Sequence, residues 1–289
     1  MELISSYEDY HRLMMNNKIT YKPTFSNVAW PEDYITRLIS QKRLLFQEFN
    51  GGILFFDDEV RYYEISYVWN IGFEFPTLKI ENKPYVIKNV YRDGKMPSEM
   101  CDVEEMIKKC GFTLKRQSQL AECEKFEPNK KILELYDFSK KLLDHNGMRL
   151  RRLTQEMIEP FREFQSAIPL IPYYELQYFT DAELIEQSKE NNLIIASCDY
   201  DSEICGYSHA YTMGKYICGV IAVKDKYKDV GGITLALSAE SYKRDYGKQL
   251  HRIGWIGTDN TASIRYHKKM GWIFTNKKMN EWVKEVNYE

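Results

Sequence analysis

The stretch NTASIRYHKKMGW, residues 260–272, determines how the second half of the chain is interpreted. Asn260 is a residue type that caps helix N-termini, and Gly271 is the type that most often ends a helix. The stretch therefore predicts a short helix. Tyr266 and His267 lie side by side in its middle. Because one residue turns a helix by about 100°, these two side chains cannot both face the same ligand.

Helical periodicity assigns different positions to the two neighbours. Tyr266 is in step with Ala262 and Met270, which predicts that it packs in the core. His267 has Ser263 one turn earlier, where a hydroxyl could orient the ring. Alternatively, His267 lies on a solvated face of the helix with Lys268 and Lys269. With a reference pKa of ~6.5 against ~10 for tyrosine, histidine is the residue that exchanges protons near neutral pH.

A glycine pair precedes the longest helix predicted in this half. The stretch VKDKYKDVGGITLAL, residues 223–237, runs from an apolar strand through a lysine-rich loop into Gly231 and Gly232. The free amides and the dipole of a helix N-terminus attract anions, which favours an anion-binding turn with Lys224, Lys226 and Lys228 at its rim. The spacing matches neither a P-loop nor a dinucleotide-binding fingerprint. The alternative is an ordinary strand-to-helix turn.

The length of 289 residues predicts two domains. We expect an N-terminal domain over 1–125, a linker with a helix over 126–146 and a second domain over 147–289. Alternating apolar residues predict a strand-rich meander over 41–70. The second half predicts strands at 148–153, 192–198, 204–213, 216–223, 250–256 and 281–286, with helices at 154–164, 181–189, 233–246 and 260–270.

Composition disfavours several function classes. A net charge of −2 lacks the basic excess of nucleic-acid-binding surfaces, and no apolar run approaches the ~20 residues of a membrane helix. The first residues show no signal-peptide pattern, so a cytoplasmic location is expected. Six cysteines without a C-x-x-C pair and five scattered histidines predict reduced thiols and no metal site.

The order strand, glycine loop, helix, strand, short helix resembles the GCN5-related N-acetyltransferase superfamily. Residues 223–237 look like its pyrophosphate-binding motif, and residues 260–272 look like its Asn-x-x-Ala/Ser-Ile motif ending in Lys-x-Gly-Phe. The resemblance implies an α+β fold whose mixed, mostly antiparallel sheet is flanked by helices and splayed between two central strands. Acetyl-CoA or another short acyl-CoA would bind in the splay, and no metal is implied.

The resemblance also implies site residues. Cofactor contacts would come from Ile221, Ala222, Val223, Lys228, Val230, Gly231, Gly232, Ile233, Asn260 and Ser263. Ile233 departs from the family pattern, which has a small residue there. The family often places its acid seven residues after the motif asparagine, which is His267, with Tyr266 beside it. An acceptor amine would meet Tyr173, Tyr174, Glu175, His209 and Tyr211.

The expected function is therefore transfer of an acyl group from coenzyme A to an amine of a small molecule or peptide. Two alternatives stay open: a tRNA-dependent aminoacyl transferase with tandem domains of this fold, and a metabolite-binding protein without activity. Residues 97–116 contain Lys108-Lys-Cys-Gly-Phe112 and resemble the end of the same fold, a helix closed by Lys-x-x-Gly-Phe before a strand. The N-terminal domain is thus either a degenerate, cofactor-free copy or an unrelated lid or dimerisation module, and a homodimer stays open.

Overall fold

The computed structural model describes residues 1–78, 83–92, 96, 98–124, 130–167, 176, 179–198, 203–213, 215–228, 232–245 and 251–285. The chain forms two compact units. Unit 1 comprises residues 1–120, 255–260 and 275–289, and unit 2 comprises residues 121–254 and 261–274. Neither unit is a single continuous segment, so the predicted cut near residue 125 describes the domains incompletely.

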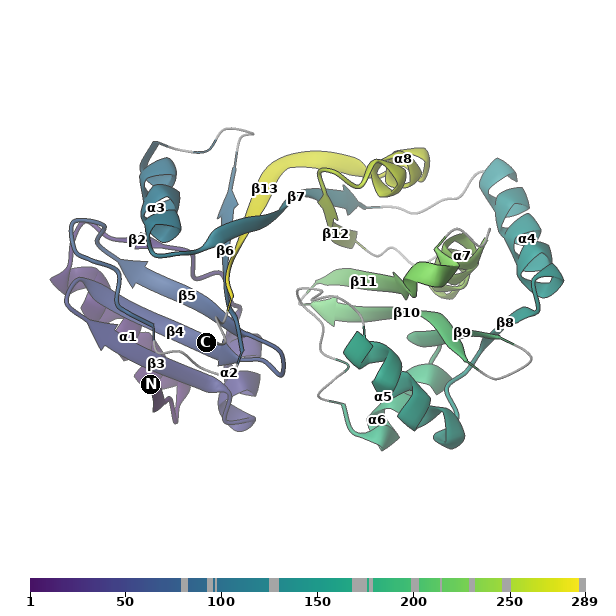
Figure 1. Cartoon of the computed structure of the whole chain (residues 1–289), viewed down its shortest axis with the longest axis horizontal. Helices are drawn as coiled ribbons and strands as arrows, with labels where there is room; N and C mark the ends of the chain where they lie inside the picture. The colour runs from purple at the N-terminus through teal and green to yellow at the C-terminus, as the bar shows by residue number, and fades with distance from the viewer. Residues whose placement is uncertain are drawn as a thin grey trace. The chain divides into compact units, whose positions relative to one another are not determined.

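Unit 1 begins with two helices for which the sequence had given no prediction, and continues with a sheet (Figure 1). Ser6 caps the first helix by accepting a hydrogen bond from the Asp9 amide. The elements are β1 (Glu2–Leu3), α1 (Tyr7–Thr20), β2 (Phe25–Ser26), α2 (Glu32–Ser40), β3 (Leu44–Phe49), β4 (Gly52–Asp58), β5 (Tyr63–Trp69), β6 (Tyr85–Tyr91), α3 (Ser98–Lys109), β7 (Thr113–Cys123) and β13 (Ile273–Lys284). The last element lies along β6 in antiparallel register from Lys278 to Lys284.

The sheet of unit 1 has the order β1-β3-β4-β5-β6-β13-β7, and helices cover both of its faces. Ile53, Phe55 and Val68 pack against α1 and α2 on one face. Phe56, Ile65 and Trp69 belong to a second cluster, which holds Val103 and Ile107 of α3. Alternate residues of β4 and β5 thus enter different cores, as the two-residue period of a strand requires.

In unit 2 the strand order is β8-β9-β10-β11-β12. Its elements are α4 (Lys130–His145), β8 (Met148–Arg151), the 3-10 helix η1 (Gln155–Met157), α5 (Ile158–Ala167), α6 (Asp181–Lys189), β9 (Leu193–Cys198), β10 (Ile204–Met213), β11 (Tyr216–Val223), the 3-10 helix η3 (Asp225–Tyr227), α7 (Ile233–Asp245), β12 (His251–Gly257) and α8 (Thr261–Lys269). The predicted bounds of α6, β10 and β11 agree with these residue for residue.

Helices lie on both faces of this sheet (Figure 1). One face packs Tyr207 against Phe161 and Phe164 of α5, with Leu184 of α6 in the same cluster. The other face packs Ala196 and Cys205 against Ala236 and Leu237 of α7. The helix α4 lies over α7, because Leu143 shares that second cluster and Tyr136 stacks on Tyr242. The linker helix is therefore an integral part of unit 2.

Two local predictions were wrong. Thr154 stands at the N-cap position of η1 in an extended conformation, but its side chain makes no capping hydrogen bond. The final strand was predicted to begin at residue 281, whereas β13 begins at Ile273. Its first half carries Asn276, Lys277 and Lys278, and this polar run hides the alternation that identifies a half-buried strand.

Candidate functional site

The parallel strands β11 and β12 of unit 2 separate soon after they begin. Their register contains only Tyr216 opposite His251 and Ile217 opposite Arg252. β11 then continues for six more residues to Val223, paired with β10 on its other side. This is the splay that the family resemblance implied. It leaves one edge of an interior strand, residues 218–223, outside that parallel ladder.

β11 is also unusually exposed for a strand with neighbours on both sides. Only Cys218 and Ala222 of its eight residues are buried. Ile221 is 37% exposed, and a Cβ built on Gly219 would meet only one backbone atom within 4 Å. A partly exposed apolar face, beside a strand edge that lies outside the parallel ladder of the described residues, suits a ligand that combines amide groups with apolar carbon, because amides can extend the ladder.

Unit 1 contains a similar splay that its own chain fills. There β5 and β6 are parallel and pair only from Tyr63–Tyr85 to Ile65–Ile87. Beyond that point β2 pairs antiparallel with β5. The Asn27 side chain donates to the carbonyl oxygens of Ile65 and Lys88 at 3.2 and 3.1 Å, and accepts from the Tyr67 amide at 2.7 Å. All seven residues of β5 are buried. Within the described residues the two splays thus differ: β2 and Asn27 close the splay of unit 1, whereas the β11–β12 register of unit 2 does not extend to residues 218–223.

The lysines of the β11–α7 turn are already paired with carboxylates. Lys224 and Lys226 bind the two oxygens of Glu203 at 2.8 and 2.6 Å, and Lys228 binds Asp225 at 2.5 Å. Tyr227 also donates to Glu203 at 2.6 Å. Partial burial would raise the pKa of Glu203, but these donors hold it at about 2. The rim of the turn is therefore less positive than the lysine count predicted.

Gly232 has the positive φ of 94° that favours glycine, immediately before α7. The α4 backbone lies close to this glycine, because the Ser139 carbonyl oxygen is 3.0 Å from where a Cβ on Gly232 would stand. The side chain of Ile233 is 1% exposed and packs in the core. Its size, which departs from the family pattern, therefore does not obstruct the turn. Val230 and Gly231 lie outside the described residues.

The short helix α8 begins directly after Asn260, and Gly271 ends it with a φ of 80°. His267 is half-buried, and its Nδ1 lies 2.8 Å from the Ser263 carbonyl oxygen. A carbonyl only accepts, so Nδ1 carries the hydrogen and the neutral ring keeps Nε2 as an acceptor. The ring packs edge-on against Trp272, at 4.8 Å between centroids. Burial lowers the pKa of His267, and the bond to Ser263 partly opposes that shift.

Tyr266 turns toward the core, as its periodicity predicted. It joins a cluster that includes Tyr136 of α4, Tyr242 of α7 and Met270. Its hydroxyl lies 3.3 Å from the Tyr136 hydroxyl. Burial raises the pKa of Tyr266, which makes the phenol a poorer acid near neutral pH. Helix geometry therefore separates the two neighbours: Tyr266 packs in the core, and His267 lies half-buried on another side of the helix.

His209 and Tyr211 share the face of β10 that meets α5 and α6. Their rings stack at 5.7 Å, and Phe179 packs edge-on against His209 at 6.1 Å. His209 is 3% exposed, and burial, followed by the charge of Arg244, lowers its pKa to about 3. It is a neutral residue at any physiological pH. The other predicted acceptor residues, Tyr173, Tyr174 and Glu175, lie outside the described residues.

Sequence reasoning missed Asn27, Ser139 and Glu203. Asn27 bonds to backbone groups 38 to 61 residues away, and no local pattern indicates such a contact. Ser139 was within a predicted helix whose packing partner was unknown. Glu203 did leave a signal, because it ends the acidic turn between two predicted strands while three lysines follow the next strand.

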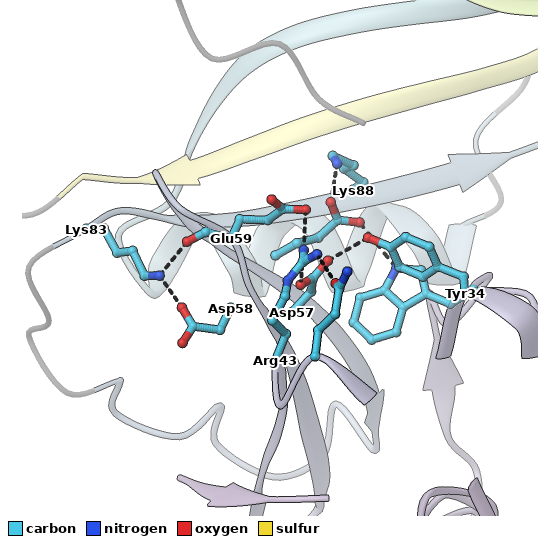
Figure 2. Close-up of polar contacts among 10 residues, drawn as sticks. Tyr34, Arg43, Asp57, Asp58, Glu59, Lys83 and Lys88 are labelled. Atoms are coloured by element: carbon cyan, nitrogen blue, oxygen red, sulfur yellow. Dashed lines mark hydrogen bonds and ion pairs between the residues drawn. The ribbon is translucent and has the colours of Figure 1, made fainter. Parts of the chain in front are cut away.

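A second buried polar cluster lies in unit 1 (Figure 2). Arg43 binds Asp57 at 2.6 Å and Glu59 at 2.8 Å, and Tyr34 donates to Asp57 at 2.6 Å. Lys88 pairs with Glu64, and Lys83 with Asp58. Burial and the nearby Glu59 raise the pKa of Asp57, although Arg43 opposes this. Within the described ranges, no three His, Cys, Asp or Glu side chains gather to hold a metal ion. We interpret the cluster as a structural charge network.

Solved structures share this architecture. A GCN5-related N-acetyltransferase-like protein from Streptococcus suis is 11% identical, with 94% of this chain and 99% of that chain covered and a TM-score of 0.51. The GCN5-related glucosamine N-acetyltransferase region of a fungal multi-domain GH3 beta-N-acetylglucosaminidase is also 11% identical, over 94% of this chain and 36% of that one, at 0.57. A tandem GNAT protein from the clavulanic acid biosynthesis pathway covers 100% of this chain and 98% of its own, at 10% identity and 0.48.

The two likenesses with TM-scores of 0.57 and 0.51 show the fold: the chain has the mixed α+β architecture of GCN5-related N-acetyltransferases. At 11% identity they show the fold alone. No protein-family model matches the sequence, and no curated protein does either. None of the described helices is long and apolar enough to cross a membrane.

Proposed function

We propose that unit 2 is an acyltransferase that moves an acetyl or other short acyl group from coenzyme A to an amine of a small molecule or peptide. The observation that carries this proposal is the partly exposed strand β11, which separates from β12 after two residue pairs in the described part of the chain, whereas β2 and Asn27 close the splay of unit 1. A retained opening in one of two similar units favours a ligand there. The proposal therefore assigns one coenzyme A site to each chain.

The proposed contacts divide among the parts of coenzyme A. The edge formed by Ile221, Ala222 and Val223 would bind the pantetheine amides, and the start of α7 at Gly232 and Ile233 would bind the pyrophosphate, together with Val230 and Gly231. Lys228 and Ser263 complete the proposed contacts in unit 2, and Asn260 stays a contact predicted from the sequence motif. When bound, acyl-coenzyme A supplies an activated thioester carbonyl that the amine attacks directly.

His267 is the proposed proton carrier. In its neutral form Nε2 accepts a hydrogen bond, so it can take the proton that the ammonium nucleophile must lose. The resulting imidazolium can return a proton to the departing thiolate, so the same ring serves as base and then as acid. Such a positioned transfer contributes typically ~10²–10⁴ in rate. Tyr266 has a supporting role, because its hydroxyl is engaged with Tyr136.

The acceptor would bind beside the half-buried Tyr211 on β10, and the buried His209 would support the Tyr211 ring from within the core. Both aromatic rings are stacked there, and Phe179 packs on the same face. A face of aromatic rings attracts an organic ammonium group by cation–π interaction. Tyr173, Tyr174 and Glu175 remain predicted acceptor contacts from the α5–α6 connection.

A metabolite-binding protein without activity is the second candidate. The close approach of Ser139 to Gly232 and the pairing of Lys224 and Lys226 with Glu203 favour it, because both weaken a phosphate site. The tRNA-dependent aminoacyl transferase has less support, since a net charge of −2 provides no evident basic track for RNA.

Calorimetric titration of coenzyme A and acetyl-coenzyme A into the purified chain tests the proposal. Binding at one site per chain is expected, and Ile221→Asp should weaken it by placing a charge on the exposed strand face. Ile19→Asp is the matched control, because Ile19 is 62% exposed on α1 of unit 1. Absence of binding at millimolar ligand, or equal affinity in both variants, would remove the site from β11.

A further inference from the structure

The hairpin of β9 and β10 brings two cysteine sulfurs together. Cys198 ends β9 and Cys205 is the second residue of β10. Their Sγ atoms lie 3.0 Å apart, about 1 Å more than the ~2.05 Å of a disulfide bond. Both are free thiols in the structure, Cys198 half-buried and Cys205 buried.

A β-bulge produces this contact. The register of β10 with β9 shifts between Ile204 and Gly206, so Cys205 is the additional residue. Ile204 packs on the α5 side of the sheet, whereas Cys205 and Cys198 both belong to the cluster on the α7 side. In a regular ladder Cys205 would alternate to the face opposite Gly206. The bulge therefore orients both thiols to one face.

Polar groups surround the pair. The Cys198 thiol donates to the Tyr227 hydroxyl at 3.3 Å, and Tyr227 donates to Glu203. The Cys205 thiol lies 3.4 Å from the Glu203 carbonyl oxygen. Burial raises the pKa of Cys205, which leaves the more accessible Cys198 as the thiol that an oxidant meets first.

We propose that Cys198 and Cys205 are a redox modification site, at which hydrogen peroxide oxidises the two thiols to a reversible Cys198–Cys205 disulfide. The Cys198 sulfur attacks the peroxide oxygen, the O–O bond breaks, and one water leaves as a sulfenic acid forms. The Cys205 sulfur then attacks the Cys198 sulfur and releases a second water. Two thiols and one hydrogen peroxide thus give one disulfide and two waters. A dithiol reductant reverses the change.

The disulfide has a consequence at the β11–α7 turn, and this consequence rests on the proposed function. Oxidation removes the hydrogen that Cys198 donates to Tyr227. Tyr227 ends η3, and it shares Glu203 with Lys224 and Lys226. Hydrogen bonds therefore link the turn that would bind the pyrophosphate to the oxidation state of Cys198 and Cys205. We expect coenzyme A binding to weaken about fivefold to tenfold on oxidation, the size of one lost hydrogen bond.

Peptide mapping after alkylation without reduction tests the proposal. The folded chain is treated with hydrogen peroxide, and the expected product is a Cys198–Cys205 crosslink that dithiothreitol removes. Cys101→Ser, which replaces an exposed thiol, should keep the crosslink. Cys205→Ser should lose it and leave Cys198 as a sulfenic acid that dimedone traps. Circular dichroism verifies that each variant is folded.

Two results would overturn the inference: complete alkylation of both thiols after peroxide treatment of the folded chain, or a crosslink that forms only in denaturant. The readout is a covalent bond and does not depend on coenzyme A. A crosslinked chain for which neither redox form binds coenzyme A would therefore refute the proposed function while the modification site stands.

Discussion

The carbonyl oxygen of Ser139 in α4 lies 3.0 Å from the point where a Cβ on Gly232 would stand, just before α7. The glycine is thus required by the packing of α4 as well as by its positive φ. The family resemblance assigned this glycine to phosphate binding. The structure adds a second reason for it, namely that the linker helix sits against the turn.

Gly232→Ala should therefore destabilise unit 2 by more than backbone strain alone. Gly271→Ala is the matched control, because Gly271 has a similar φ of 80° with nothing within 4 Å of a Cβ. We expect about 1–2 kcal/mol for Gly271→Ala from the left-handed conformation, and at least 1 kcal/mol more for Gly232→Ala. Chemical denaturation measures both. Equal losses would show that α4 does not restrict the turn.

His267→Gln should reduce the rate of acyl transfer and remove one limb of the pH profile. Neutral His267 is the form that accepts a proton, and burial lowers its pKa below 6.5. The wild-type rate should therefore be constant near neutral pH and fall as the pH drops below that pKa. The variant should lose about 10²-fold or more in rate and show no such fall. An unchanged rate and profile would exclude His267 from proton transfer.

His209 makes the stability of the chain depend on pH. Its pKa falls from 6.5 to about 3 on folding, so the unfolded chain binds more protons between these values. The contribution of His209 to the free energy of unfolding is fully present above pH 6.5 and is lost progressively as the pH falls toward 3. At pH 5.5 the loss is about 1.4 kcal/mol. His209→Gln should remove this share of the pH dependence of the unfolding free energy, whereas His145→Gln, at an exposed position, should retain it.

Asn27 offers a test of the closed splay in unit 1. Asn27→Ala removes three hydrogen bonds to the backbone of β5 and β6, and we expect a loss of about 2–3 kcal/mol. Asn27→Asp keeps the shape and the acceptor for Tyr67 but cannot donate to the two carbonyls. It should be at least as destabilising as alanine. Wild-type stability of the aspartate variant would contradict the bridging role.

The sequence predicted an element well where the apolar pattern of that strand or helix is clear within its own residues. β11 is a short, nearly continuous apolar run, and β10 is bounded by an acidic turn before it, so their predicted bounds are those of the structure. α1 was not predicted, because its sequence YEDYHRLMMNNKIT is mostly polar and only Tyr10 and Asn17 are buried. Tertiary packing, rather than an apolar stripe, stabilises such a helix.

The motifs of the candidate site could be predicted from the sequence, whereas the tertiary contacts of their residues could not. The spacing from Asn260 selected His267, and periodicity placed Tyr266 in the core, as the aromatic cluster with Tyr136 shows. The contact of Ser139 with Gly232 joins elements far apart in sequence, so no local pattern could reveal it. The same holds for Asn27, whose partners lie on two different strands.

The antiparallel pairing of β13 with β6 bears on how the chain is made. Residues 278–284 leave the ribosome long after β6, yet they supply its neighbour in unit 1. Unit 1 is therefore incomplete, with the β6 edge unpaired, until the ribosome has synthesised the whole of unit 2. An unpaired edge recruits other strands, so a nascent or truncated chain depends on protection from aggregation during that interval.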